Sequence, residues 1–145
     1  MVSIKTVKVS ASGPDGWVIK TIAGKHTVLV DQPQSMGGSD SAPTPLEYVF
    51  IALGSCLVTV AKIVASQKRI NLRKVDVEIS GDINLAVLRG QERNERAGFR
   101  SIDVKVNIDA DLSKEEKMEF LHEIDQRCPV SDNLLNTTPI NLSLA

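Results

Sequence analysis

The chain is poor in aromatic residues and almost without net charge. Aromatics make up 3% of its 145 residues, with one Trp and one Tyr, so the core must be built from aliphatic side chains. The formal net charge of -1 gives no electrostatic reason to expect nucleic acid or an anionic membrane as a partner. Hydrophobic and charged contents of 42% and 24% are those of an ordinary soluble globular protein.

The sequence also shows no pattern typical of a membrane-spanning or targeting segment. The charge-free apolar stretch at residues 48–61 has 14 residues, whereas about 20 are needed to cross a bilayer, so a buried helix is favoured. The first residues alternate apolar and polar side chains and contain no apolar signal-peptide core. We therefore expect a cytoplasmic protein that folds as a single domain over residues 1–145.

Cysteine is scarce: Cys56 and Cys128 are the only two, 72 residues apart. Cytosolic thiols stay reduced, so such a pair is more often free or catalytic than a structural bridge. Neither belongs to a CxxC motif, and the residues alone leave open a redox pair or two small buried hydrophobic side chains. Cys128 precedes Pro129 and can be the N-cap of a short helix, whose free N–H groups favour a thiolate.

Alternation of apolar and polar residues, bounded by turn signals, predicts six β-strands. The first strand is expected to begin near Val7. The other five are expected to cover residues 17–22, 26–31, 75–79, 102–108 and 140–144. The first three follow one another through short turns and should form an antiparallel meander. The charged segment at residues 89–98 is expected to connect the fourth and fifth strands.

Capping signals predict two main helices. Thr44 and Glu47 form a capping box that opens a long central helix, and Ser113 and Glu116 open a second one that ends at Cys128. The central helix is apolar on all sides, which requires burial on all sides. At about 36 Å it is also longer than one domain of this size is wide. Two such helices packed together in a homodimer would resolve both difficulties.

The segments around the two cysteines resemble the cysteine motifs of the OsmC/Ohr family of thiol-dependent hydroperoxide reductases. PLEYVFIALGSC at residues 45–56, preceded by GSDSAP at residues 38–43, is similar to the first motif, and CPVSDNLL at residues 128–135 is similar to the second. The order of the predicted elements matches along nearly the whole chain. The resemblance implies an α+β fold, with antiparallel sheets wrapped around a long central helix in an intertwined homodimer.

The same resemblance implies a peroxidase chemistry that protects against oxidative stress. Cys56 would be the peroxidatic thiolate, which attacks an organic hydroperoxide, releases an alcohol and is left as a sulfenic acid. Cys128 would resolve that acid as an intramolecular disulfide, which an external dithiol would reduce. This nucleophilic chemistry needs no metal or bound cofactor.

The chain departs from the family pattern at the activating group. Family peroxidases use an arginine from the amino-terminal part, held by a glutamate at the start of the long helix, and Glu47 is the candidate for that glutamate. No arginine precedes Arg69, so that Lys20 and Lys25 are the hairpin cations left to substitute. Glu47 lies nine residues before Cys56 where the peroxidase pattern has ten, and it can equally serve only the capping box. These departures place the chain nearer to the less characterised OsmC-like branch.

The charged connection contains four arginines, which either supply the cation that activates Cys56 or form a solvated surface: Arg89, Arg93, Arg96 and Arg100.

Two other functions stay open. The missing arginine motivates a non-catalytic dimer that binds an apolar small molecule beside Cys56, and a thiol redox sensor would use the disulfide to alter a partner surface. A zinc site built from His26, His122 and the two cysteines is disfavoured, because no two of these residues have close ligand spacing.

Overall fold

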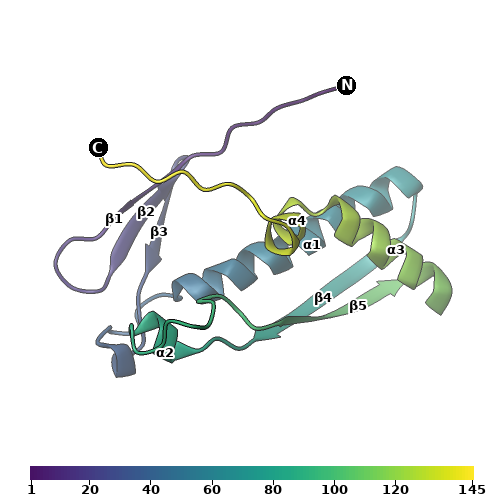
Figure 1. Ribbon diagram of the computed structural model, residues 1–145. Helices are drawn as coiled ribbons and strands as arrows, with labels where there is room; N and C mark the ends of the chain where they lie inside the picture. Colours follow the sequence, from purple (N-terminus) through teal and green to yellow (C-terminus); the bar gives the residue numbers. More distant parts are fainter. The chain divides into compact units, whose positions relative to one another are not determined.

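The computed structural model describes residues 1–145 and has an α+β architecture (Figure 1). Its strands are β1 (Val9–Ser12), β2 (Ile19–Ala23), β3 (His26–Val30), β4 (Leu72–Gly81) and β5 (Ile102–Ala110). Its helices are the 3-10 turn η1 (Gln34–Met36), α1 (Pro45–Lys68), α2 (Leu85–Leu88), α3 (Lys114–Arg127) and α4 (Pro129–Leu135). The chain forms two compact units, Met1–Val49 and Phe50–Ala145. A single domain over residues 1–145 stays a prediction.

The first unit contains the predicted antiparallel meander. β2 pairs with β1 on one side and with β3 on the other, in the registers Val9↔Ala23 and Ile19↔Val30. Gly24, in the tight turn between β2 and β3, has φ +61, a left-handed conformation that glycine adopts without a steric penalty. The three strands therefore stand where the alternation pattern placed them, to within two residues at their starts.

Asp31, just after β3, organises the loop that leads into α1. Its side chain is fully buried and accepts hydrogen bonds from the backbone N–H groups of Gln32 (2.8 Å), Ser39 (3.2 Å) and Ser41 (3.0 Å) and from the Ser41 hydroxyl (2.7 Å). The backbone N–H and the hydroxyl of Ser41 are the main reasons that the pKa of Asp31 falls to about 2. Gly38 lies so close that an added Cβ would stand 2.0 Å from the Gln32 carbonyl oxygen. The loop is thus wrapped around one buried carboxylate.

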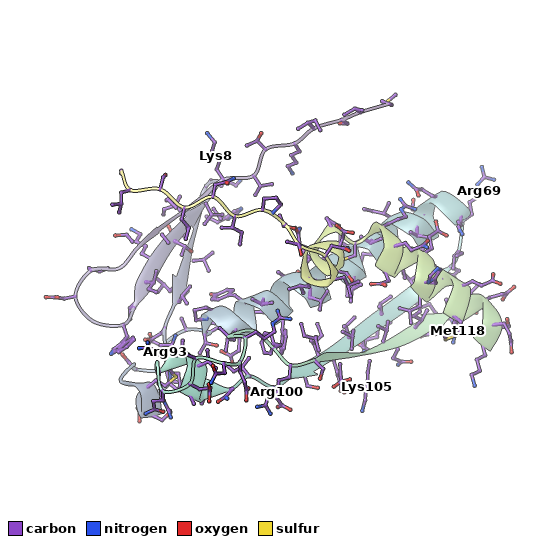
Figure 2. All side chains as sticks on the ribbon, viewed as in Figure 1. Lys8, Arg69, Arg93, Arg100, Lys105 and Met118 are labelled. Carbon is purple, nitrogen blue, oxygen red and sulfur yellow. The ribbon has the colours of Figure 1, made fainter.

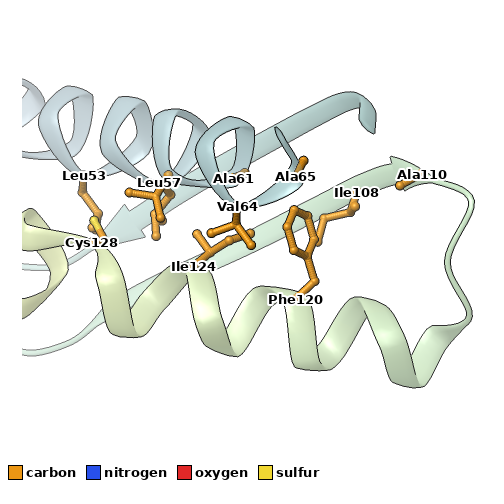
Figure 3. Close-up of a cluster of buried hydrophobic side chains, with 11 residues drawn as sticks. Leu53, Leu57, Ala61, Val64, Ala65, Ile108, Ala110, Phe120, Ile124 and Cys128 are labelled. Carbon is orange, nitrogen blue, oxygen red and sulfur yellow. The ribbon is translucent and has the colours of Figure 1, made fainter. Parts of the chain in front are cut away.

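The second unit is built around an antiparallel ladder of β4 and β5, in the register Val77↔Val106. Alternate side chains of β4 are exposed, as the period-two pattern predicts. The core lies where this ladder meets α1 and α3 (Figure 3). Its buried members are aliphatic except for one Phe and one Cys: Leu53, Leu57, Val60, Ala61, Val64, Ala65, Ile108, Ala110, Phe120, Ile124 and Cys128. The low aromatic content therefore did predict the character of the core.

Helix α1 buries only part of its apolar surface within one chain. Six of its 24 residues are buried, whereas Ile51 is 50% exposed and Ile63 is 44% exposed. By length and composition alone α1 could also cross a membrane, a test that core helices of soluble proteins pass as well. Its buried residues pack in the core with β5 and α3, so apolar side chains such as Ile51 and Ile63 stay exposed on other faces of the helix.

The predicted strand at residues 140–144 is wrong for the isolated chain. Figure 1 draws the carboxyl end as an extended segment without regular structure, and Ile140 is 82% exposed. A strand needs a neighbour to satisfy its backbone N–H and C=O groups, and none of the five strands pairs with this segment. Apolar residues do alternate with polar ones at residues 140–144, but this alternation alone does not provide a strand to pair with.

The connection between β4 and β5 contains the helical turn α2, which the sequence reasoning missed. Asn84 caps it, because its side-chain oxygen accepts a hydrogen bond of 3.0 Å from the Ala86 N–H. The aromatic rings of Phe50 and Phe99 stack 4.6 Å apart between α1 and the end of this connection. An Asn before a short apolar run was the signal that could have revealed α2.

Candidate functional site

The fold of the second unit brings Cys56 and Cys128 into direct contact. Cys56 is half-buried on α1, Cys128 is fully buried between α3 and α4, and their Sγ atoms lie 2.8 Å apart. Both are free thiols, and a disulfide would bring the sulfurs to about 2.05 Å. A bond between two residues that are 72 positions apart therefore requires only a small approach of the side chains.

Cys56 owes its position to the packing of α1. Leu53 and Leu57, one turn before and one residue after it, are both buried in the core, which fixes the rotation of the helix about its axis. Gly54 lets α1 come close to β4, because a Cβ at that position would stand 3.3 Å from the Ile79 side chain. The helix thus presents Cys56 towards the junction of α3 and α4.

Cys128 is held by the change of direction between α3 and α4. It ends α3 and is the N-cap of α4, as predicted, with extended backbone angles (φ -82, ψ 109) and Pro129 at the first position of α4. Its backbone N–H donates to the Asp125 carbonyl at 3.2 Å. Its Sγ accepts the Ser131 N–H at 3.4 Å, so both the main chain and the thiol are anchored. Figure 3 shows Cys128 beside Leu53 at one end of the core.

Burial makes Cys128 a poor acid. Loss of solvation raises the pKa of the Cys128 thiol most, and the hydrogen bond with Cys56 raises it further, against a smaller lowering by the backbone N–H of Ser131. A neutral Cys128 thiol can donate a hydrogen bond to the Cys56 sulfur, which lies 2.8 Å from its own sulfur. The pair is therefore asymmetric, with the better solvated sulfur on α1.

A second polar contact spans the same junction. The hydroxyl of Ser131, which is buried in the first turn of α4, donates a hydrogen bond of 2.6 Å to Oδ1 of Asp125 in the last turn of α3. It is the one hydrogen bond whose partners lie in α3 and α4 themselves. The sequence reasoning did not single out these two residues, because their spacing of six fits no single helix.

Glu47, the third predicted site residue, lies in the first turn of α1. The Thr44 N–H donates to Oε2 of Glu47 at 2.7 Å, and the Glu47 N–H donates to the Thr44 hydroxyl at 3.3 Å, which together form the predicted capping box. These bonds from Thr44 lower the pKa of Glu47. No lysine or arginine forms an ion pair with its carboxylate. A catalytic role of Glu47 stays a prediction.

Neither sulfur is hydrogen-bonded to a cationic side chain. Figure 2 shows Arg93 and Arg100 on the segment between β4 and β5, where Arg100 forms an exposed ion pair of 3.0 Å with Glu95. His26 and His122 are both exposed. No three His, Cys, Asp or Glu side chains gather in a group that could hold a metal ion. The polar partners of the site are thus the two thiols, Ser131 and Asp125.

The chain thus places a half-buried and a fully buried thiol against each other, between a long helix and a bent helix junction of an α+β fold. The sequence model of the OsmC-like protein family matches residues 38–143, which include both cysteines. The chain therefore belongs to the OsmC-like family, as the two motifs predicted. None of the curated protein sequences matches it.

Solved structures share the fold at low sequence identity. An OsmC-like protein from Mycoplasma pneumoniae has a TM-score of 0.79 and 20% identity, over 92% of this chain and 89% of that chain. An organic hydroperoxide resistance protein OsmC from Legionella pneumophila has a TM-score of 0.66 and 18% identity, over 92% and 91%. An organic hydroperoxide resistance protein from Elizabethkingia anophelis has a TM-score of 0.66 and 20% identity, over 94% and 93%. The predicted fold class, antiparallel sheets with a long helix, is confirmed.

Proposed function

We propose that this protein reduces organic hydroperoxides with Cys56 as the attacking thiolate and Cys128 as the resolving thiol. The observation that supports the proposal most is the 2.8 Å contact between the two sulfurs within an OsmC-like fold. The names of the Legionella and Elizabethkingia proteins, which describe organic hydroperoxide resistance, agree with it. A cytoplasmic location and a role in the oxidative stress response complete the proposal.

The reaction follows from the asymmetry of the pair. The Cys56 thiolate attacks the distal oxygen of the hydroperoxide, an S–O bond forms, the O–O bond breaks, and the alkoxide takes up a proton and leaves as an alcohol. The Cys128 sulfur then attacks the sulfenic sulfur, an S–S bond forms and the S–O bond breaks. Hydroxide leaves as water with the proton of the Cys128 thiol. An external dithiol returns both cysteines to thiols and is itself oxidised to a disulfide.

Partners of the proposed enzyme are a second copy of the chain, the hydroperoxide and the dithiol. The intertwined homodimer would cover the exposed apolar side chains of α1 and could bring a cation or the Glu47 carboxylate of one chain towards the cysteines of the other. Such a contribution is the role that we assign to the dimer, since no cationic side chain of the same chain bonds either sulfur.

The first test is a thiol count on the purified, reduced protein before and after one equivalent of cumene hydroperoxide, read out by intact mass. We expect loss of both thiols and a mass decrease of two hydrogens, faster than with hydrogen peroxide. Cys56→Ser should abolish hydroperoxide consumption, whereas Cys128→Ser should keep a single oxidation that stops at a sulfenic acid trapped by dimedone. Two untouched thiols in the wild-type protein would refute the proposal.

The alternative function is a dimer that binds an apolar small molecule without turnover. The lack of a cationic side chain at either sulfur is the observation that favours it. Native mass spectrometry of gently purified protein would then detect a bound apolar ligand, and that protein would leave cumene hydroperoxide unconsumed.

A further inference from the structure

The junction between α3 and α4 contains a polar contact that the proposed reaction does not yet use. Ser131 Oγ donates to Asp125 Oδ1 at 2.6 Å, and the backbone N–H of the same Ser131 donates to Cys128 Sγ at 3.4 Å. One residue therefore touches both the carboxylate at the end of α3 and the sulfur of the buried cysteine. Asp125 contacts the other side of Cys128 as well, because its carbonyl accepts the Cys128 N–H at 3.2 Å.

Two features indicate that this contact is more than an ordinary helix-end bond. A carboxylate in the last turn of a helix opposes the helix dipole, so Asp125 is unfavourable at its position unless a donor offsets the charge. Ser131 is 8% exposed, and a buried hydroxyl is costly without a partner. The Ser131 hydroxyl thus offsets the charge of Asp125, and the Asp125 carboxylate gives the buried hydroxyl an acceptor. The bond crosses a junction where Pro129 prevents a continuous helix.

We propose that Asp125 and Ser131 are a positioning pair that clamps the junction of α3 and α4 and thereby holds the Cys128 thiol against Cys56. This inference rests on the proposed function, in which Cys128 is the resolving thiol. The pair has no hydrogen bond with the Cys56 sulfur, and it acts on the reaction through Cys128.

The expected consequence is a larger effect on disulfide formation than on the first oxidation. When the Ser131–Asp125 bond is lost, α4 can turn relative to α3 and the Ser131 N–H no longer fixes the Cys128 sulfur. The effective concentration of the Cys128 thiol near Cys56 then falls. Attack of a hydroperoxide on Cys56 forms and breaks no bond at this junction, so its rate should change much less than the rate of disulfide formation.

The test uses the full-length protein equilibrated with mixtures of reduced and oxidised glutathione, which needs no hydroperoxide. In this exchange the two protein thiols become a disulfide while one glutathione disulfide becomes two thiols. Ser131→Ala and Asp125→Ala should each lower the equilibrium constant for the Cys56–Cys128 disulfide by about tenfold, the effect of one lost hydrogen bond on a thiol pair. The double variant should be no worse than either single one, because both remove the same bond.

Conservative variants and a matched control separate positioning from general damage to α4. Ser131→Thr keeps the hydroxyl and Asp125→Asn keeps an acceptor oxygen, so both should restore most of the wild-type equilibrium constant. Asn133→Ala removes two hydrogen bonds that do not cross the junction, one of 2.9 Å to the Pro129 carbonyl within α4 and one of 2.7 Å from the Thr138 hydroxyl. It should leave the constant unchanged. Asp125 is exposed, so Asp125→Ala is expected to fold even if Ser131→Ala does not.

The two proposals fail separately. The proposed positioning pair would be overturned if Asp125→Ala and Ser131→Ala both keep the wild-type equilibrium constant for the Cys56–Cys128 disulfide. It would also be overturned if Asn133→Ala lowers this constant as much as they do. A wild-type protein that leaves cumene hydroperoxide unconsumed would overturn the peroxidase, whatever the glutathione equilibria show. If it is active, stopped mixing with cumene hydroperoxide should give about tenfold slower disulfide formation in Ser131→Ala and a smaller change in the rate of Cys56 oxidation.

Discussion

Among single residues, Asp31 shows how one buried carboxylate can define a whole loop. All four of its hydrogen-bond partners are donors, so an ionised carboxylate suits the site and an amide does not. An Asn side chain would turn an NH₂ group towards these donors and leave some of them unpaired. The role of Asp31 was not visible in the sequence, where it reads as the last residue of a strand.

The lowered pKa of Asp31 predicts a pH-dependent contribution to stability. Its pKa falls from 3.8 to about 2 on folding, so the folded state binds the Asp31 proton less readily than the unfolded state does. The stabilisation is complete at pH values well above 3.8 and disappears as the pH falls towards 2. Asp31→Asn should therefore unfold at lower urea concentration than the wild type at pH 7, with a difference that shrinks below pH 4. A difference that is constant from pH 7 to pH 2.5 would contradict this prediction.

At the scale of single elements, the start of α1 offers a test of Glu47. Glutamine can replace glutamate in a capping box, so Glu47→Gln should keep the helix start. If the partner chain brings the Glu47 carboxylate to the cysteines, Glu47→Gln should slow Cys56 oxidation roughly 100-fold, as is typical of a lost proton-transfer or charge-stabilising group. Thr44→Ala, which removes the other half of the box, should cost about 1 kcal/mol of unfolding free energy. A change of less than about twofold in the reaction of Glu47→Gln with cumene hydroperoxide, at unchanged stability, would contradict a catalytic role and leave Glu47 with the capping box.

Helix α3 is fixed by its apolar face, which predicts unequal costs along one helix. Ile124 is 1% exposed in the core, whereas Met118 is 61% exposed on the same helix, where Figure 2 labels it. Ile124→Ala should lower the free energy of unfolding by about 2–5 kcal/mol because it leaves a cavity. Met118→Ala should change it by less than about 0.5 kcal/mol. Urea denaturation of both variants measures the contrast, and equal effects would mean that α3 packs through another face.

At the scale of the whole molecule, the unpaired ends of the chain predict self-association. Leu142 is 93% exposed and Leu144 fully exposed at the carboxyl end, and Ile4 is 85% exposed at the amino end. Apolar side chains that alternate with polar ones suit a strand which pairs with another chain. Sedimentation of the wild-type protein should therefore give twice the 15.7 kDa mass of one chain. Deletion of residues 139–145 should weaken the dimer, and a monomeric wild-type protein at micromolar concentration would exclude it.

Local patterns were enough to predict most elements of the fold. The capping boxes at Thr44 and Ser113, the alternation in β4 and β5 and the N-cap at Cys128 depend on residues within a few positions of one another. Their hydrogen bonds form inside the same segment, so the segment alone specifies them. The family motifs have the same character, because each lies within one continuous stretch of residues.

The tertiary structure decided what depends on distant segments meeting. The sequence motifs identified Cys56 and Cys128 as the candidate pair. The distance of 2.8 Å between their sulfurs could not be predicted, because it depends on how α1 packs against the junction of α3 and α4. The Ser131–Asp125 bond depends on the same junction. The strand expected at residues 140–144 failed for the complementary reason, because a strand exists only where another one pairs with it. Segments carry their own helix and strand signals, whereas contacts between segments are set by packing of the whole chain.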